Sequence, residues 1–223
     1  FDHFSSLAAE AIVVIAPVDS LAEAVASQGA SVPVVAVSGG RAFGRGVSVV
    51  HADQRGGARA LVEHLMSLGH RDIACVAGPQ EWFEARERVA GWREAMDDAG
   101  LPKREPLVGS WEARWGYVAG QNLVEDGLPD AVMCANDEVA VGLLRAFAEA
   151  RVSVPGDVSV AGFDDVPMAA YAGPGLTTVR QDFGDLGRCA LEAVSHALDG
   201  ETVDTYVRPT RLVVRGSTGA CAR

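Results

Sequence analysis

Two polar side chains in the second half of the chain stand where two predicted strands end. Asn136 follows the apolar run at residues 131–134, and Asp164 follows the apolar run at residues 158–162. Because open parallel α/β sheets bind ligands beyond the carboxyl ends of their strands, this pair predicts a binding site. An amide both donates and accepts hydrogen bonds, and a carboxylate accepts two hydroxyl protons, so these residue types suit a hydroxylated ligand. The alternative is that both residues only cap the helices that follow them.

An alternation of strands and helices must position this pair. Apolar runs predict strands at residues 11–16, 32–37, 47–50, 73–77, 131–134 and 158–162, with short strands at 107–108, 206–207 and 212–214. Helical patterns predict helices at residues 21–27, 54–68, 84–99, 114–126 and 185–198, and one more between the last two long strands. The continuous run at 11–16 is expected to be buried on both faces of its sheet. The alternation predicts an α/β fold with parallel sheets and right-handed crossovers.

Length and charge narrow the possible partners. The 223 residues, 48% of them hydrophobic, are enough for one large domain or two lobes of about 100 residues each. No apolar run approaches the roughly 20 residues of a membrane span, so we expect no membrane partner. The net charge of −11 repels phosphate backbones. We therefore expect that this part of the protein does not itself bind nucleic acid.

Reactive side chains form no recognisable catalytic or metal-binding pattern. The cysteines include no C-x-x-C pair, which argues against a zinc site and favours buried thiols in a reducing cytosol. The histidines are scattered, and no serine or cysteine stands in a nucleophile elbow. We therefore expect no catalytic residue, no metal and no cofactor, and we predict that the chain is not an enzyme. The residues concerned are Cys75, Cys134, Cys189, Cys221, His51, His64, His70 and His196.

An ordered set of short motifs resembles the sensor domain of LacI/GalR-type transcription regulators. No single motif is specific, but together they span nearly the whole chain in the family's order. In the first half they lie at residues 51–53, 57–59, 62–65, 68–74 (LGHRDIA), 77–79 and 88–92 (RVAGW). In the second half they lie at residues 135–137 (AND), 154–155, 157–160, 162–165 (GFDD), 176–182 (LTTVRQD) and 211–218.

The resemblance implies a periplasmic-binding-protein-like fold of type I. In that fold, two Rossmann-like lobes with parallel sheets face each other across a cleft, and the chain crosses between them three times. Here the crossovers are expected near residues 50–52, 179–182 and 208–211. The N-terminal lobe is then residues 1–50 plus 182–208, and the C-terminal lobe is residues 51–181 plus 209–216. Residues 217–223 form a small, polar tail that we expect to be disordered.

The resemblance also implies where the ligand binds. Arg88 matches the arginine that clamps the effector, and its planar fork of donors suits vicinal hydroxyls, a carboxylate or a phosphate. Asn136 and Asp164 match polar residues of the same site. Trp111 matches an aromatic residue that packs on a ligand ring, with a plain core role as the alternative. Gln181 lies at a predicted crossover, where one side chain can bridge both lobes.

Two further residues are weaker site candidates. Trp82 lies just before the helix of Arg88 and could stack on the ligand, or serve a lid or an interface. Val49 falls at the first predicted crossover, where an apolar contact with the ligand is plausible.

The resemblance implies a cytoplasmic, ligand-operated regulator, most often a repressor. Such a regulator is a homodimer that binds a small effector, here a sugar or related metabolite. It binds operator DNA through a helix-turn-helix head that these 223 residues do not include, and the family's first two strand-helix units are also missing from them. The alternative is an exported solute-binding protein of a sugar transporter, which shares the fold.

Overall fold

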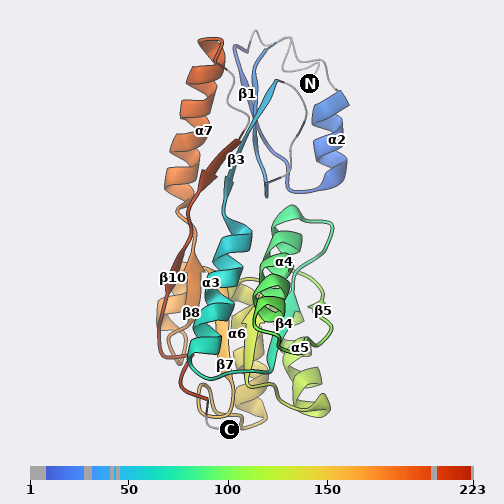
Figure 1. The fold of residues 1–223 in the computed structure, drawn as a ribbon, viewed down its shortest axis with the longest axis vertical. Helices are drawn as coiled ribbons and strands as arrows, with labels where there is room; N and C mark the ends of the chain where they lie inside the picture. Colours follow the sequence, from blue (N-terminus) through green and yellow to red (C-terminus); the bar gives the residue numbers. More distant parts are fainter. Residues whose placement is uncertain (1–8, 28–31, 41–42, 44–45, 202–204, 222–223) are drawn as a thin grey trace. The chain divides into compact units, whose positions relative to one another are not determined.

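The chain forms two compact units. The computed structural model describes residues 9–27, 32–40, 43, 46–201 and 205–221 (Figure 1). Unit 1 comprises Phe1–Asp53, Glu81–Glu84 and Asp182–Pro209, and unit 2 comprises Gln54–Gln80, Ala85–Gln181 and Thr210–Arg223. The units differ from the predicted lobes at four places. The first boundary follows Asp53, unit 1 gains Glu81–Glu84, the last boundary follows Pro209 and not residue 208, and unit 2 includes the predicted tail.

Unit 1 is built on a parallel sheet with a helix on each face. Its strands β1 (Ile12–Ile15), β2 (Val34–Val37), β3 (Val47–Ala52) and β9 (Thr205–Arg208) lie in the order β1-β2-β3-β9. One face of the sheet packs on α7 (Phe183–Leu198), through Val35 and Val50. The other face packs on α2 (Asp19–Ser27), through Val34, Ala36 and Val49. The alternation of apolar side chains between the faces explains why both helices are needed.

The prediction that the first strand is buried on both faces is wrong for the described residues. Val13 is 47% exposed and Ile15 is 71% exposed. β1 is an edge strand that pairs only with β2 in the described sheet. The continuous apolar run encodes a strand, but the burial of its second face depends on a covering element, and no described segment covers it.

Unit 2 is built on a larger sheet. Its strands are β4 (Ile73–Ala77), β5 (Leu107–Val108), β6 (Ala131–Cys134), β7 (Ser159–Asp164), β8 (Thr177–Arg180) and β10 (Arg211–Val213), in the order β10-β8-β7-β6-β4-β5. All neighbours pair in parallel except β10 and β8, which are antiparallel. The predicted parallel sheets are thus present, with one antiparallel strand, β10, at the edge of the larger sheet.

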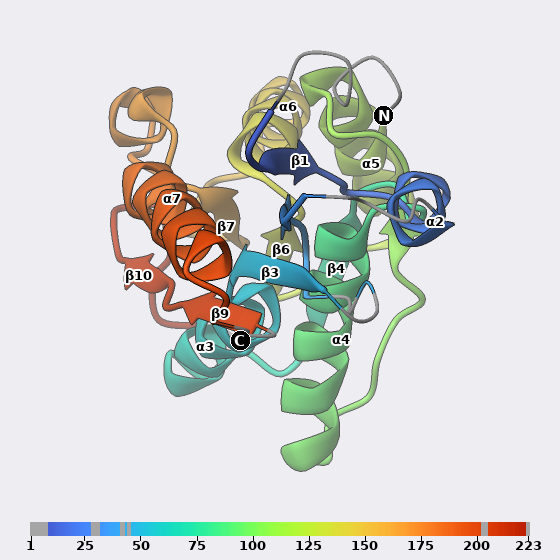
Figure 2. The same ribbon diagram turned by 90° about the horizontal axis from the view of Figure 1, so that it is seen from above.

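Helices cover both faces of this sheet (Figure 2). On one face, α3 (Gln54–Ser67) and α4 (Phe83–Asp98) form a core around the fully buried Trp92. On the other face, α5 (Ala113–Asp126) and α6 (Asp137–Glu149) form a core around the fully buried Phe147. Apolar side chains of the sheet point alternately into these two cores, as expected for strands buried on both faces.

The segment after β10 is an integral part of unit 2, so the prediction of a disordered tail is wrong there. Ser217 is fully buried, and its Oγ donates to the carbonyl of Val160 at 2.6 Å and accepts from the amide of Thr177 at 2.8 Å. Farther on, the amide of Cys221 donates to the carbonyl of Leu68 at 2.8 Å. A small, polar sequence is compatible with disorder, but here its polar groups satisfy backbone groups at the sheet.

Two further observations bear on the exclusions made from the sequence. Among the described residues, no helix has both the length and the apolar character needed to cross a membrane. No group of three or more His, Cys, Asp and Glu side chains within the described ranges could hold a metal ion. Cys75, Cys134 and Cys189 are buried, and Cys221 is partly buried.

Candidate functional site

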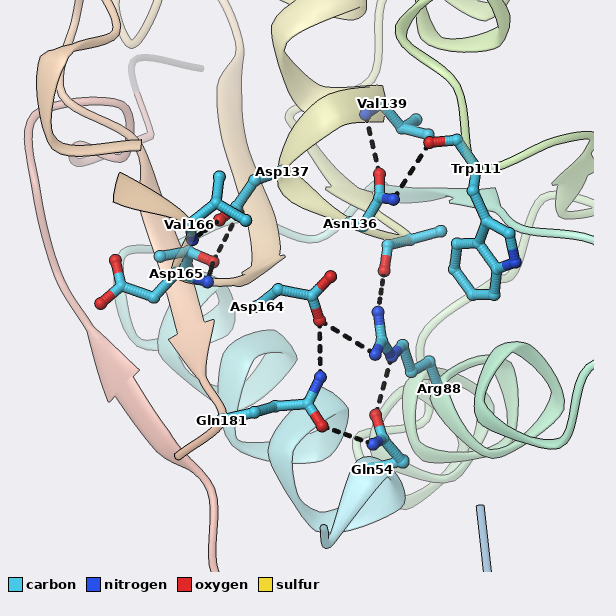
Figure 3. Close-up of polar contacts among 12 residues, drawn as sticks. Gln54, Arg88, Trp111, Asn136, Asp137, Val139, Asp164, Asp165, Val166 and Gln181 are labelled. Carbon is cyan, nitrogen blue, oxygen red and sulfur yellow. Dashed lines mark hydrogen bonds and ion pairs between the residues drawn. The ribbon is translucent and has the colours of Figure 1, made fainter. Parts of the chain in front are cut away.

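Most of the predicted site residues lie together in unit 2, at the carboxyl ends of its strands. Asn136 lies two residues after the end of β6, Asp164 ends β7, and Gln181 directly follows β8. Arg88 reaches them from the second turn of α4, and Gln54 reaches them from the start of α3. Parallel strands bring these chain positions to one edge of the sheet, so the sequence pattern and the observed arrangement agree (Figure 3).

Arg88 is the centre of this group and is only 5% exposed. Its Nε donates to Oε1 of Gln54 at 2.9 Å, and its Nη2 donates to Oδ1 of Asp164 at 3.1 Å. Its Nη1 donates to the carbonyl of Ala135. The guanidinium carbon lies 3.9 Å from the centroid of the Phe163 ring, which adds a cation–π contact on one face. A buried cation is tolerated because charge, hydrogen bonds and an aromatic face all compensate it.

Four side chains close a ring of hydrogen bonds, which we call the polar ring: Gln54, Arg88, Asp164 and Gln181 (Figure 3). Besides the two bonds from Arg88, Nε2 of Gln54 donates to Oε1 of Gln181 at 2.7 Å. The Nε2 of Gln181 then donates to Oδ1 of Asp164 at 2.6 Å. Because each member holds its neighbour, the ring fixes these side chains before any ligand arrives.

The carboxylate of Asp164 can accept a further hydrogen bond. Its Oδ1 accepts from both Arg88 and Gln181, whereas its Oδ2 accepts no hydrogen bond from any described residue. The side chain is 21% exposed, more than the 6% of the Arg88 side chain. An ionised carboxylate accepts at two oxygens, so Oδ2 is available for a hydroxyl or amine proton of a ligand.

Asn136 does what the competing interpretation expected, because it caps a helix. Its Oδ1 accepts from the amide of Val139 at 2.8 Å, at the first turn of α6. Its Nδ2 donates to the carbonyl of Trp111 at 3.0 Å, and that residue's ring centroid lies 5.5 Å from the guanidinium carbon of Arg88. Asn136 therefore anchors the loop of Trp111 beside Arg88, and a ligand role for it would use the second proton of the same amide.

Sequence reasoning missed three contributors. The sequence patterns mark Gln54 only as the first residue of a helix, and Phe163 and Asp137 only as parts of motifs. The amide of Gln54 links Arg88 to Gln181, the ring of Phe163 supports Arg88, and Asp137 is buried beneath Asp164. The signal that could have found Gln54 is its place at a helix start next to a predicted crossover.

Comparison with known proteins assigns the chain to a family. Residues 62–218 match the family model described as a periplasmic binding protein-like domain. That match spans most of the chain and all the described strand ends of unit 2. The chain belongs to the periplasmic binding protein-like family.

Within this family, the curated relatives include transcription repressors. The chain is 37% identical over 173 residues to the lactose operon repressor of Klebsiella pneumoniae, covering 77% of this chain and 49% of that protein. The chain thus spans about half the length of the curated relatives it matches. These matches confirm the predicted resemblance to LacI/GalR-type regulators, and the proteins matched are repressors, not enzymes.

Solved structures of the family confirm the predicted α/β fold. The lac repressor dimer bound to operator and the anti-inducer ONPF superposes with a TM-score of 0.87 at 30% identity, covering 98% of this chain and 77% of that one. A LacI family transcriptional regulator from Enterococcus faecium with bound ribose superposes with a TM-score of 0.84 at 25% identity, covering 98% of this chain and 82% of that one.

Two of the predicted ligand residues belong to unit 1 of this periplasmic binding protein-like domain. Val49 is 1% exposed and packs in the core with Phe83, as an ordinary core residue does. Trp82 is half-buried and forms an isolated antiparallel bridge with Val18. Their roles in ligand contact stay predictions.

Proposed function

We propose that the chain is the effector-sensing domain of a transcription repressor and that it binds a neutral, hydroxylated small molecule at the polar ring. The observation that carries this proposal is the preorganised group of Arg88, Asp164 and Gln181, with Oδ2 of Asp164 left as an acceptor. Groups held in place by their neighbours lose little freedom on binding, so their hydrogen bonds contribute more fully to affinity.

The charges of the site favour a neutral ligand over a phosphorylated one. Arg88 already pairs with Asp164 at 3.1 Å, so the two charges cancel at short range. An anionic group placed at Oδ2 of Asp164 would be repelled by this carboxylate. The guanidinium of Arg88 would not compensate that repulsion, because it is already paired with Asp164. A sugar hydroxyl can instead donate to that oxygen, while the ring of Trp111 offers an apolar face beside Arg88. A neutral sugar is therefore the proposed effector class.

Regulation follows from a difference in affinity between two states. We propose that the effector binds one conformation of this domain more tightly and so biases a homodimer between DNA-bound and released forms. DNA binding would be supplied by a head segment outside this chain, in the cytoplasm. The supporting facts are the family membership and the lac repressor, whose dimer has been solved on its operator.

Titration calorimetry with a panel of neutral sugars, the corresponding sugar phosphates and nucleosides tests the effector proposal. We expect at least one neutral sugar to bind, and its phosphate to bind about tenfold or more weakly. Arg88→Ala and the milder Asp164→Asn should each lower the affinity for that sugar by about tenfold or more, because a charge-assisted hydrogen bond contributes about 1.5–3 kcal/mol.

Arg145→Ala is the matched control, since Arg145 is an arginine of unit 2 whose side chain is 70% exposed and pairs with Glu149 at the surface. Its affinity should equal that of the unchanged chain. Unchanged affinity in both Arg88→Ala and Asp164→Asn would contradict the assignment of the site.

A further inference from the structure

Asp137 is a buried carboxylate that contacts the turn carrying Asp164. It is the first residue of α6 and is 1% exposed. Its Oδ1 accepts from the hydroxyl of Thr178 in β8 at 2.6 Å, and its Oδ2 accepts from the amide of Val166 at 2.8 Å (Figure 3). One side chain thus joins the start of α6 to β8 and to the segment that follows β7.

Gly162 in β7 provides the space for this carboxylate. A Cβ atom at that position would lie 2.3 Å from Oδ1 and 3.2 Å from the Cα of Asp137. Such a distance is impossible without moving Asp137, so the glycine and the buried carboxylate are used together. The motif at residues 162–165 therefore contains both the acceptor Asp164 and the gap that admits Asp137.

The turn between Asp137 and the polar ring has an unusual backbone. Asp164 has a φ of 104° and Asp165 a φ of 53°, in the region that residues other than glycine rarely adopt. Such conformations persist only where neighbouring contacts hold them, and they gather at functional sites. Here the contacts come from two carboxylates on either side of Asp164, which are Asp137 and Asp165.

The buried side chain of Asp165 also holds the turn. Its Oδ2 accepts from Nε of Arg180 at 2.5 Å, its Oδ1 accepts from Nη2 of Arg215 at 2.6 Å, and its amide donates to Oγ1 of Thr178 at 3.3 Å. The carboxylates of Asp165 and Asp137 are thereby both occupied by scaffold groups. Asp164 alone is left with an oxygen for a ligand.

We propose that Asp137 is a positioning residue of the effector site: its ionised carboxylate fixes the Asp164–Val166 turn and so sets the direction in which Oδ2 of Asp164 faces the ligand. The inference rests on the proposed function for the identity of the ligand. The positioning itself rests on the bonds to Thr178 and Val166 and on the space at Gly162.

The ionisation of Asp137 can be told apart from that of the charged and titratable groups around it. Asp164 and Asp165 face it from the end of β7, while Arg88 pairs with the former and Arg180 and Arg215 pair with the latter. Cys134 at the end of β6 remains a protonated thiol, because burial raises its pKa. Burial also raises the pKa of Asp137 to about 6, against the opposing effect of the bonds from Thr178 and Val166.

The pKa of Asp165 is shifted in the opposite direction to that of Asp137, so the two carboxylates can be distinguished by titration. Burial acts to raise the pKa of Asp165, but the hydrogen bonds from Arg215 and Arg180 outweigh it and hold that pKa below its usual value. A titration with a midpoint near 6 therefore does not belong to Asp165.

The first test needs no ligand and uses proton–nitrogen NMR of the whole chain between pH 5 and 7.5. The amide of Val166 reports the bond to Asp137, and the side-chain amide of Gln181 reports the place of Asp164, to which it donates. We expect both signals to move with a midpoint near pH 6. In Asp137→Asn, both should stay near the low-pH position of the unchanged chain at every pH.

The control is Asp130→Asn. Asp130 precedes β6 at the opposite end of the strand that Asp137 follows, and it likewise accepts backbone amides, those of Arg71 and Asp72 at 2.9 Å. This variant should leave the Gln181 and Val166 titration unchanged. A midpoint near 6 that survives in Asp137→Asn would assign the titration to another group and would overturn the inference.

The second test measures affinity for the neutral sugar found in the calorimetric panel. At pH 7.5, Asp137→Asn should bind about threefold more weakly than the unchanged chain, and Asp137→Ala, which removes both acceptors, about tenfold or more weakly. The unchanged chain should approach the affinity of Asp137→Asn as the pH falls to 5, whereas the variant should bind equally at both pH values.

The two proposals fail in different ways. Unchanged affinity in Asp137→Ala, in a chain that still unfolds cooperatively, would overturn the positioning role and leave the effector site standing. If no panel member binds while the signals of Gln181 and Val166 follow Asp137, the effector proposal fails and the positioning of Asp164 stands. Signals that ignore both Asp137 and pH would overturn the inference whatever binds.

Discussion

At the scale of single residues, the charged side chains of the site differ in the partners that hold them. Arg88 is neutralised by Asp164, and Asp165 is neutralised by Arg180 and Arg215. Asp137 has no basic partner in the described structure and is held by a hydroxyl and an amide. Burying a carboxylate without a cation costs stability, so this residue marks a conflict between folding and function.

That conflict predicts a pH-dependent gain in stability for Asp137→Asn. The pKa of Asp137 is raised from 3.8 to about 6 in the folded chain, so folding favours the protonated form. The free energy of unfolding contributed by this group is therefore highest below about pH 4, falls as the pH rises to 6, and is constant above that. At pH 7.5, the variant should be more stable by on the order of 2 kcal/mol.

Urea unfolding at several pH values measures this difference. The advantage of Asp137→Asn over the unchanged chain should shrink as the pH falls below 6 and vanish near 4. A variant that is less stable at pH 7.5 would show that the lost charge-assisted hydrogen bonds outweigh the relief of burial. Higher stability together with weaker sugar binding is the outcome expected of a functional residue.

How much of the site could be predicted depended on the kind of signal each residue leaves. The strand ends alone pointed to Asn136 and Asp164, because a polar residue after an apolar run is a local signal. Arg88 needed the family resemblance, since an arginine on a helix is usually solvated. The burial of Asp137 left no signal, because it depends on Gly162 and Thr178, which lie 25 and more residues away in the sequence.

At the scale of elements, the strongest sequence patterns gave the right elements. The strand at Ile73–Ala77 was predicted with its observed bounds, and the helix beginning at Gln54 ends one residue earlier than expected. β8 (Thr177–Arg180) was not predicted as a strand, because its two threonines hide the apolar character of a short run. Both threonines are fully buried. The amide of Thr177 donates to the hydroxyl of Ser217, and the hydroxyl of Thr178 donates to Asp137. No local sequence pattern reveals these partners.

The contact between α5 and α6 yields a prediction about packing. A Cβ atom on Gly142 of α6 would lie 1.8 Å from the carbonyl oxygen of Ala113, and one on Gly116 of α5 would lie 1.9 Å from that of Val139. Both neighbours are backbone atoms that cannot turn away. Gly142→Ala should therefore lower the free energy of unfolding by about 3 kcal/mol, although alanine favours helices over glycine.

Thermal or urea unfolding checks this expectation against Val118→Ala, a substitution on the same helix pair at a side chain that is 38% exposed. That control should change stability by less than about 1 kcal/mol. If Gly142→Ala proved neutral, the close approach of the two helices would be contradicted.

At the scale of the whole molecule, the proposed homodimer needs an apolar contact surface. In unit 2, the 3₁₀ helix Pro167–Tyr171 presents Tyr171 at 88% exposure and Met168 at 61%. Large apolar side chains that are this exposed next to each other are typical of an interaction surface. We expect Tyr171→Glu to weaken the dimer, because it places a charge in a desolvated contact.

Light scattering after size-exclusion chromatography measures the outcome. The unchanged chain should have the mass of two chains at micromolar concentration, and Tyr171→Glu should shift it toward the mass of one. Val118→Glu, which adds the same charge on α5, should remain a dimer. A monomeric unchanged chain would contradict the homodimer itself, whereas a dimeric Tyr171→Glu would place the contact elsewhere.

The order of strands in unit 1 also has a consequence for how the protein is made. β3 ends at Ala52, but its neighbour β9 begins only at Thr205, so the ribosome synthesises nearly all of unit 2 in between. At typical elongation rates, those roughly 150 residues take on the order of ten seconds. Throughout that time β3 is an unpaired edge with apolar faces, which is a template for aggregation. Production of this domain should therefore depend on chaperones and on slow expression at low temperature, more than its final stability would indicate.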